Sequence, residues 1–281
     1  MNSLRIPTRI KFFPNFITDY FIKKNVLSLP LSNAKTFHLC YFSCESYFPY
    51  LYCALHSLTK HLTEINYKVY VFNDSDMPIS ESQIALIKKM LPDVEFILWP
   101  KSMGWGTQQI ENIWNAYDYA SKNANDIDII ARVDSDVFFF NDRIFQIALR
   151  SDADLIGDGH FVEFKYVQGG CYFFKANAIN QINQMIKDHT IEKLVENIDI
   201  VVEDIAADYF ARKLNLKVWQ TWFMAFPQEI QNCGGINKWI RFKFSCAHFV
   251  MKNKDKMIEA YTDFILPAKD KAIFLNNLKQ K

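Results

Sequence analysis

Runs of apolar residues alternate with amphipathic segments along the first half of the chain. Continuous apolar runs predict strands buried on both faces, and four occur, at residues 37–44, 67–74, 94–100 and 126–136. Between them, apolar residues recur at intervals of three and four, which predicts helices at residues 49–62, 80–92 and 106–123. Because strands alternating with helices are typical of βαβ units, we predict an α/β fold with a mixed, mostly parallel sheet flanked by helices.

The helix predicted at 80–92 has clear end signals: Ser80 stands at the N-cap, Gln83 at the capping-box position, and Pro92 closes the segment. The second half of the chain has a less regular pattern. It predicts helices at 143–150 and 201–215, a strand at 153–158, a strand then a helix at 166–189, and strands at 216–222 and 243–250.

Composition limits the classes of function. The 281 residues are 50% hydrophobic and 16% aromatic, which suits one large globular domain with small appendages. The net charge of +1 gives no reason to expect a nucleic-acid partner. Six cysteines without Cys-x-x-Cys or zinc-type spacing are expected to be free thiols in a reducing compartment.

No run reaches the roughly 20 apolar residues of a membrane span. The first 25 residues also lack the apolar core and cleavage site of a secretory signal, so we expect a cytoplasmic protein. Their basic and aromatic character offers two alternatives, a packed or frayed extension or a segment in peripheral contact with a membrane. The sequence leaves the oligomeric state open.

Asp134 and Asp136 end the predicted strand at 126–136, between two apolar blocks. Ligands of parallel sheets bind beyond the carboxyl ends of strands. Carboxylate oxygens favour Mg²⁺ or Mn²⁺, and such ions complete their shells with substrate phosphates. A solvated strand-to-loop turn is the alternative interpretation of the pair.

The stretch "RVDSDVFFF" resembles the Asp-x-Asp motif of nucleotide-sugar-dependent glycosyltransferases with the GT-A fold. Three later stretches resemble other parts of such enzymes in the same order: "YVQGGCYFFKANAI" the Gly-Gly segment, "EDIAADYFARKLNLKV" the Glu-Asp helix, and "SCAHFV" the late histidine. These three are loosely similar to fringe-like β-1,3-glycosyltransferases.

The resemblance covers about residues 36–250 and implies the domain organisation. We assign 1–35 to an N-terminal extension and 251–281 to a basic C-terminal tail. Between them lies a GT-A catalytic domain, with a nucleotide-sugar-binding half at 36–142 and an acceptor-binding half at 143–250.

The resemblance also implies a bound Mn²⁺ or Mg²⁺ and a nucleotide-sugar donor, with a UDP-sugar favoured. Asp136 would bind the ion, Asp134 would bind the ion or the ribose, and His248 would be a further ligand. A histidine bonded to a backbone carbonyl at the edge of the core is the alternative for His248.

Asp204 would act as the base on a glycan or other hydroxyl acceptor in an inverting transfer, with Glu203 as the alternative base. Stereochemistry stays open, because retaining enzymes of this fold also carry acidic residues there. The structural alternative makes both residues helix-dipole partners. It also makes Asp208 and Arg212 a surface ion pair.

Further donor contacts are expected at strand ends and at the glycine pair. Gly169 and Gly170 would admit a sugar close to the backbone, or form an ordinary bulge. Arg132 would reach a phosphate or make a structural salt bridge. The other expected contacts lie at the ends of the first, second and fourth strands: Phe42, Ser43, Asp74 and Ser135.

Two other functions compete with glycosyl transfer. A nucleotidyltransferase or phosphohydrolase also holds metals with aspartates at strand ends. However, the first strand runs into "CESYFPY", which has no phosphate-binding glycine-rich loop. A non-catalytic carbohydrate-binding relative is the third possibility.

Overall fold

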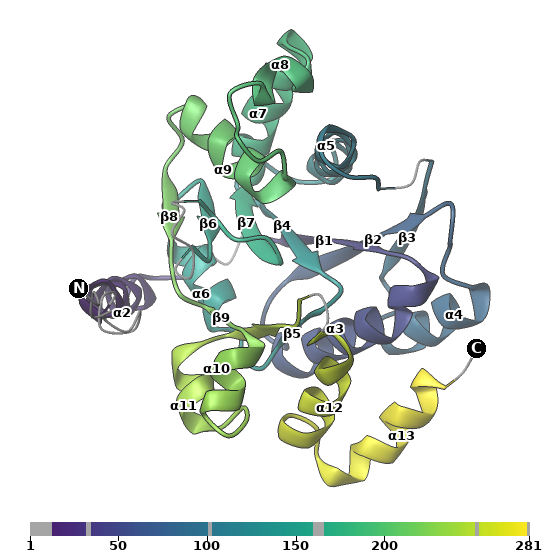
Figure 1. The fold of residues 1–281 in the computed structure, drawn as a ribbon. Helices are drawn as coiled ribbons and strands as arrows, with labels where there is room; N and C mark the ends of the chain where they lie inside the picture. The colour runs from purple at the N-terminus through teal and green to yellow at the C-terminus, as the bar shows by residue number, and fades with distance from the viewer. Residues whose placement is uncertain (1–12, 32–34, 101–102, 160–165, 251–252, 280–281) are drawn as a thin grey trace, which may run out of the picture.

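The computed structural model describes residues 13–31, 35–100, 103–159, 166–250 and 253–279. A seven-stranded sheet forms its centre, in the order β3-β2-β1-β4-β7-β6-β8 (Figure 1). Neighbouring strands are parallel except at β7, which is antiparallel to both β4 and β6. The strands are β1 (Phe37–Ser43), β2 (Tyr67–Asp74), β3 (Glu95–Trp99), β4 (Ile129–Asp134), β6 (Leu155–Gly157), β7 (Cys171–Lys175) and β8 (Val218–Gln220).

Helices cover both faces of this sheet (Figure 1). One face carries α5 (Thr107–Ser121), α7 (Ala176–Asp188), α8 (Ile191–Val195) and α9 (Glu203–Lys213). The other carries α3 (Phe48–His61) and α4 (Glu81–Met90). Along β1, Leu39 and Tyr41 join the core beside α3, whereas Cys40 joins the core beside α5. Because both faces of the strand are buried, its sequence is continuously apolar rather than alternating.

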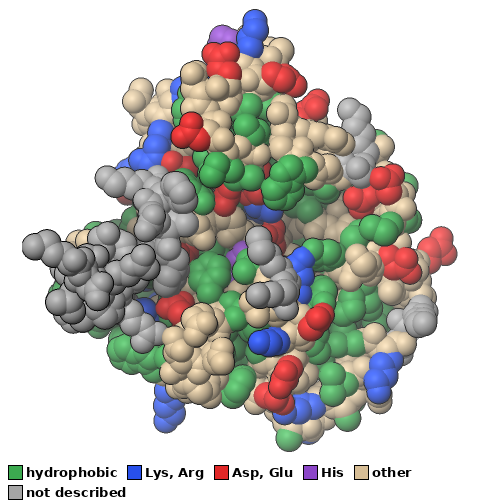
Figure 2. Space-filling view, viewed as in Figure 1, with side chains coloured by type: hydrophobic (Ala, Val, Ile, Leu, Met, Phe, Trp, Pro, Cys, Tyr) green, Lys and Arg blue, Asp and Glu red, His purple; other side chains and the backbone are tan. Residues whose placement is uncertain are grey.

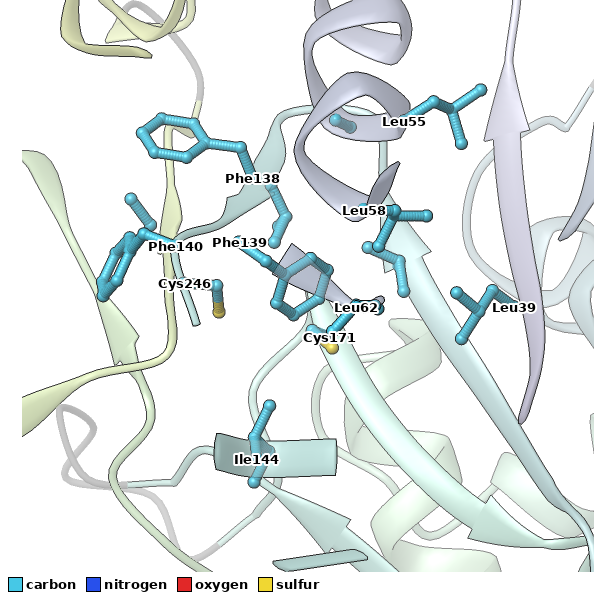
Figure 3. Close-up of a cluster of buried hydrophobic side chains, with 14 of the residues drawn as sticks. Leu39, Leu55, Leu58, Leu62, Phe138, Phe139, Phe140, Ile144, Cys171 and Cys246 are labelled. Atoms are coloured by element: carbon cyan, nitrogen blue, oxygen red, sulfur yellow. The ribbon is translucent and has the colours of Figure 1, made fainter. Parts of the chain in front are cut away.

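A second sheet of three short strands lies beside the main one. It contains β5 (Val137–Phe139), β9 (Met224–Ala225) and β10 (Cys246–His248), with β10 in the middle. Phe138 and Phe139 of β5 belong to the same apolar cluster as Leu58 of α3 and Leu62 at the C-cap of α3 (Figure 3). The Ser57 hydroxyl of α3 accepts a 2.9 Å hydrogen bond from the Phe139 amide, which joins this small sheet to the main core.

The strands and helices predicted from periodicity are all present, with ends shifted by a few residues. The Ser80–Gln83 capping box is confirmed. The strand predicted at 126–136 is too long, because β4 covers only Ile129–Asp134. The chain leaves the main sheet after Asp134, and residues 137–139 pair with β10 instead.

Several elements are absent from the sequence-based prediction. They are β5, β9, α2 (Phe13–Leu27), the 3-10 helix Glu45–Tyr47, α8, α10 (Pro227–Asn232), α11 (Lys238–Lys243), α12 (Asp255–Phe264) and α13 (Ala268–Leu278). The predicted helix at 143–150 is α6 (Arg143–Arg150).

The segments assigned to a terminal extension and a terminal tail contain helices that pack on the domain. Helix α2 lies against α6, and its Asp19 accepts a 2.6 Å hydrogen bond from the Thr221 hydroxyl. In α13, the Asn277 amide donates to the Tyr52 hydroxyl of α3 at 2.9 Å. Residues 1–12 of the extension lie outside the described residues.

All six cysteines are free, as expected from their spacing. Within the described ranges, none of the helices combines the length and the apolar character that crossing a bilayer requires.

Candidate active site

The carboxyl ends of β1, β2 and β4 meet at a pocket of about 280 Å³. Figure 2 shows a hollow near the centre of one face, where acidic, basic and histidine side chains gather between apolar ones. Seven residues predicted to bind the ion or the donor line this pocket: Phe42, Ser43, Asp74, Arg132, Asp134, Ser135 and Asp136. They come together because parallel strands end at the same edge of the sheet.

Asp134, Asp136 and His248 form one cluster. The Nε2 atom of His248 lies 3.3 Å from Asp136 Oδ1 and 3.8 Å from Asp134 Oδ2. The small sheet creates this contact, since its register places His248 opposite Val137, the residue that follows Asp136. The Phe249 amide also donates a 3.0 Å hydrogen bond to the Asp136 carbonyl.

The cluster fits a divalent cation. One ligand atom from each of the three residues can be chosen so that all lie within 4.8 Å of one another. Asp136 Oδ1 is buried and accepts no hydrogen bond from any residue that the structure describes. Burial raises the pKa of the Asp136 carboxyl and the Asp134 charge adds to this, against the opposing effect of His248. A bound cation would stabilise this arrangement, in which a buried carboxylate oxygen without a hydrogen bond lies beside a second carboxylate.

Arg132 is the buried cation at this edge of the sheet. Its Nη2 atom lies 2.8 Å from Asp134 Oδ1, and its Nη1 atom pairs with Glu203 of α9. Burial alone lowers the pKa of Arg132, but Asp134 and its other neighbours raise it above its ordinary value. The sequence left two roles open for Arg132, a phosphate contact and a structural salt bridge. The structure shows the salt bridge.

Asp204 lies in the first turn of α9, close enough to Arg132 to feel its charge. Its carboxylate accepts hydrogen bonds from the Gly169 amide at 2.9 Å and from the Ile205 amide at 2.8 Å. Burial raises the pKa of Asp204, and these amides and Arg132 oppose the shift. The acidic residue next to it, Glu203, is only 7% exposed and is held by Arg132.

Gly169 and Gly170 lie between two groups of acidic residues. Gly170 contacts the Asp134–Asp136–His248 cluster, and Gly169 contacts Asp204. The Gly170 carbonyl accepts a 2.7 Å hydrogen bond from the Asp134 amide. Gly170 has φ +95°, and a Cβ atom there would lie 2.4 Å from the His248 ring. A Cβ at Gly169 would lie 3.2 Å from Asp204 Oδ2. Glycine is therefore required at 170 by both conformation and space.

The other predicted contacts lie around the pocket. Phe42 stacks on Phe72 with ring centroids 5.2 Å apart, and its carbonyl accepts a 3.0 Å hydrogen bond from the Ser135 hydroxyl. The buried Ser43 hydroxyl has no hydrogen-bond partner among the described residues. Asp74 accepts from the Asp76 amide at 2.9 Å and the Met103 amide at 3.3 Å.

Lys254 is the main site residue that the sequence interpretation missed. It lines the pocket with Tyr47, over whose ring its Nζ atom lies at 4.0 Å. Burial lowers the pKa of Lys254. The residue lies in the segment interpreted as a tail, where several lysines occur close together, and no local pattern distinguishes it from them. Two further lining residues, Cys44 and Ile113, were also missed.

Solved structures share this architecture. The galactosyltransferase LgtC, in complex with donor and acceptor sugar analogs, matches with a TM-score of 0.51 and 14% identity, over 84% of this chain and 99% of that chain. The bifunctional glycosyltransferase WbbM matches with a TM-score of 0.55 and 12% identity, over 89% of this chain and 53% of WbbM. This chain has the GT-A fold. At such identities the likeness concerns the fold, and the chemistry depends on this chain's own site.

No protein-family model and no curated protein sequence matches the chain. The predicted GT-A architecture is therefore confirmed by structure rather than by sequence comparison.

Gly170→Ala tests the packing of the site. We expect it to destabilise the protein by about 1–3 kcal/mol more than Gly234→Ala, because the new methyl group displaces His248. Gly234 is the matched control, since its φ is also positive (+69°) and a Cβ there meets nothing within 4 Å. Urea unfolding of both variants measures the difference. Equal losses of unfolding free energy in the two variants would show that the His248 ring is not packed against Gly170.

Asp136→Asn tests the ion site. A carboxyl whose pKa is raised on folding contributes stability below its ordinary pKa and loses it as pH rises through the raised value. The variant should therefore be more stable than the ion-free protein at neutral pH. Free Mn²⁺ at about 100 times Kd should stabilise the parent chain by about 2.7 kcal/mol.

Thermal unfolding with Mn²⁺ and with chelator measures both effects. The Asp136→Asn variant should gain little from the ion. An equal Mn²⁺-dependent shift in the two proteins would place the ion elsewhere.

Proposed function

We propose that the protein is a metal-dependent glycosyltransferase that moves a sugar from a nucleotide-diphosphate donor to a hydroxyl acceptor. The observation that carries this proposal is the Asp134–Asp136–His248 cluster beside a pocket at the carboxyl edge of a GT-A sheet. The LgtC match adds support, because that galactosyltransferase was solved with donor and acceptor sugar analogs bound.

The pocket offers suitable groups for a nucleoside diphosphate. Asp134, Asp136 and His248 would hold Mn²⁺ or Mg²⁺, which when bound offsets negative charge on the leaving diphosphate. Lys254 would place a second positive charge against the phosphates, since its side chain lines the same pocket.

The nucleoside would lie toward the ends of β1 and β2. Phe42 offers an aromatic face to the base, and the unpartnered Ser43 hydroxyl and the Asp74 carboxylate offer hydrogen bonds to base or ribose. Gly169 and Gly170 would let the sugar approach the backbone. A UDP-sugar is the donor that we favour.

Asp204 is our candidate for the catalytic base. In an inverting transfer, its carboxylate would take the proton of the acceptor hydroxyl as that oxygen attacks the anomeric carbon and the bond to the diphosphate breaks. A raised pKa strengthens a carboxylate as a base. Glu203 is less suitable, because its carboxylate is already engaged in an ion pair with the buried Arg132.

An assay of the intact protein with a panel of UDP-sugars tests the proposal. We expect donor hydrolysis or transfer with Mn²⁺, loss with chelator, and recovery on adding Mn²⁺ back. Absence of turnover and of donor binding across the panel would contradict the proposal. Pyrophosphate release from a nucleoside triphosphate and a sugar phosphate would instead indicate a nucleotidyltransferase, and donor binding without turnover a non-catalytic relative.

Asp204→Asn tests the base. We expect kcat to fall by about 10²–10⁴-fold while donor binding and the folded state persist. Asp208→Asn is the matched control, because Asp208 lies one turn later on α9 and pairs with Arg212. The anomeric coupling of the product in proton NMR reports inversion or retention. Normal turnover in Asp204→Asn, or a retained configuration, would remove Asp204 from the role of base.

A further inference from the structure

Helix α2 buries a charged residue and exposes several large apolar side chains, while Val26 and Leu27 near its end pack against the core. Its inward residue Asp19 is 6% exposed and lies 2.7 Å from Lys23 Nζ, one turn later on the same face. Its outward side exposes large apolar side chains, with Phe21 56% exposed. A surface helix normally turns its apolar stripe to the core. The exposed apolar side chains of α2 are Ile17, Tyr20, Phe21 and Ile22.

Helix α11 extends this apolar surface. Its Trp239 and Phe242 are 56% and 50% exposed, and their rings stack with centroids 6.0 Å apart. The Phe242 ring lies 6.1 Å from that of Tyr20 on α2, so the two helices share one surface. Both helices lie on the same side of the molecule (Figure 1). We call Ile17, Tyr20, Phe21, Ile22, Trp239 and Phe242 the α2–α11 surface.

Basic side chains surround this surface. A pocket of about 240 Å³ between the two helices is lined by Lys23, Lys24, Arg143 and Lys243, together with Asp19, Tyr20, Leu27 and Phe242. Lys238 and Arg241 lie on α11 itself.

The acidic groups nearby are few and engaged. Asp19 is held by Lys23 and by the Thr221 hydroxyl. Glu229 lies 3.8 Å from Lys243, and Asp142 accepts a hydrogen bond from the Gln146 amide. No acidic residue precedes Asp19 in the sequence. The surface therefore combines exposed aromatic rings with an excess of positive charge.

We propose that the α2–α11 surface docks on an anionic phospholipid membrane. Tyr and Trp rings and neighbouring apolar side chains enter the boundary between headgroups and acyl chains, where amphipathic rings are stable. The lysines and arginines around them contact lipid phosphates. The pocket between α2 and α11 is placed to receive one such phosphate, because four cationic side chains line it against a single carboxylate, Asp19, which pairs with Lys23.

Charge favours a membrane over a second copy of the chain. In a symmetric dimer the same surface meets itself, which would bring the basic side chains of both copies together. Like charges at an interface are unfavourable, whereas an anionic bilayer is complementary to this surface. The proposal is independent of glycosyl transfer and can be tested without a sugar donor.

Sedimentation of the full chain with vesicles tests the proposal. We expect binding to vesicles of phosphatidylcholine and phosphatidylglycerol in equal parts, weak binding to phosphatidylcholine alone, and loss of binding as salt increases. Phe21→Ser with Phe242→Ser should lower the partition coefficient on the order of tenfold, because binding scales with inserted apolar area. Lys24→Gln with Lys238→Gln should lower it by about 25-fold, since each of the two cations contributes about fivefold.

Matched control variants change the same residue types elsewhere on the surface. Leu98→Ser with Ile273→Ser removes two exposed apolar side chains, and Lys88→Gln with Lys89→Gln removes two exposed cations of α4. Both controls should bind like the parent, and thermal unfolding confirms that every variant is folded. Failure of the parent to bind, or equal losses in test and control variants, would overturn the proposal. The proposal would also be overturned if the protein formed a dimer in solution and the double variant Phe21→Ser with Phe242→Ser dissociated that dimer.

Discussion

The site depends on the buried guanidinium of Arg132. Four carboxylates, from Asp134, Asp136, Glu203 and Asp204, gather where β4 meets the start of α9. Such a concentration of charge is unfavourable in a partly buried place unless cations balance it. Arg132 bonds to Asp134 on its own strand and to Glu203 on α9, and so links β4 to α9. Asp136 has no ion pair with Arg132 in the described structure and lies 3.3 Å from His248 instead.

The small sheet is the second requirement of the site. Asp136 and His248 are far apart in sequence, and only the pairing of β5 with β10 brings them together. Phenylalanines of β5 anchor that pairing in the core beside α3 (Figure 3). The geometry of a polar cluster therefore depends on apolar packing directly behind it, which restricts how far His248 can move.

Sequence periodicity predicted the elements of the first half well, because those strands are long and buried on both faces. It missed β9, which has only two residues, and it missed β5, because residues 137–139 follow the predicted strand at 126–136 with no turn residues between them. Sequence periodicity missed helix α2 for another reason. Its apolar residues lie on more than one side, with Phe21 exposed and Val26 and Leu27 packed against the core, so they show little helical periodicity.

The sequence by itself determined the α/β order and the position of an acidic pair at a strand end, because both are properties of neighbouring residues. The tertiary structure decided which acidic residues are paired and which are left for other partners. The role of Arg132 could not be chosen from the sequence, because its partner Glu203 comes from α9. Lys254 could not be told apart from the lysines around it, because only the folded chain places it against the pocket. Such roles depend on partners distant in sequence, whose approach only the packed fold defines.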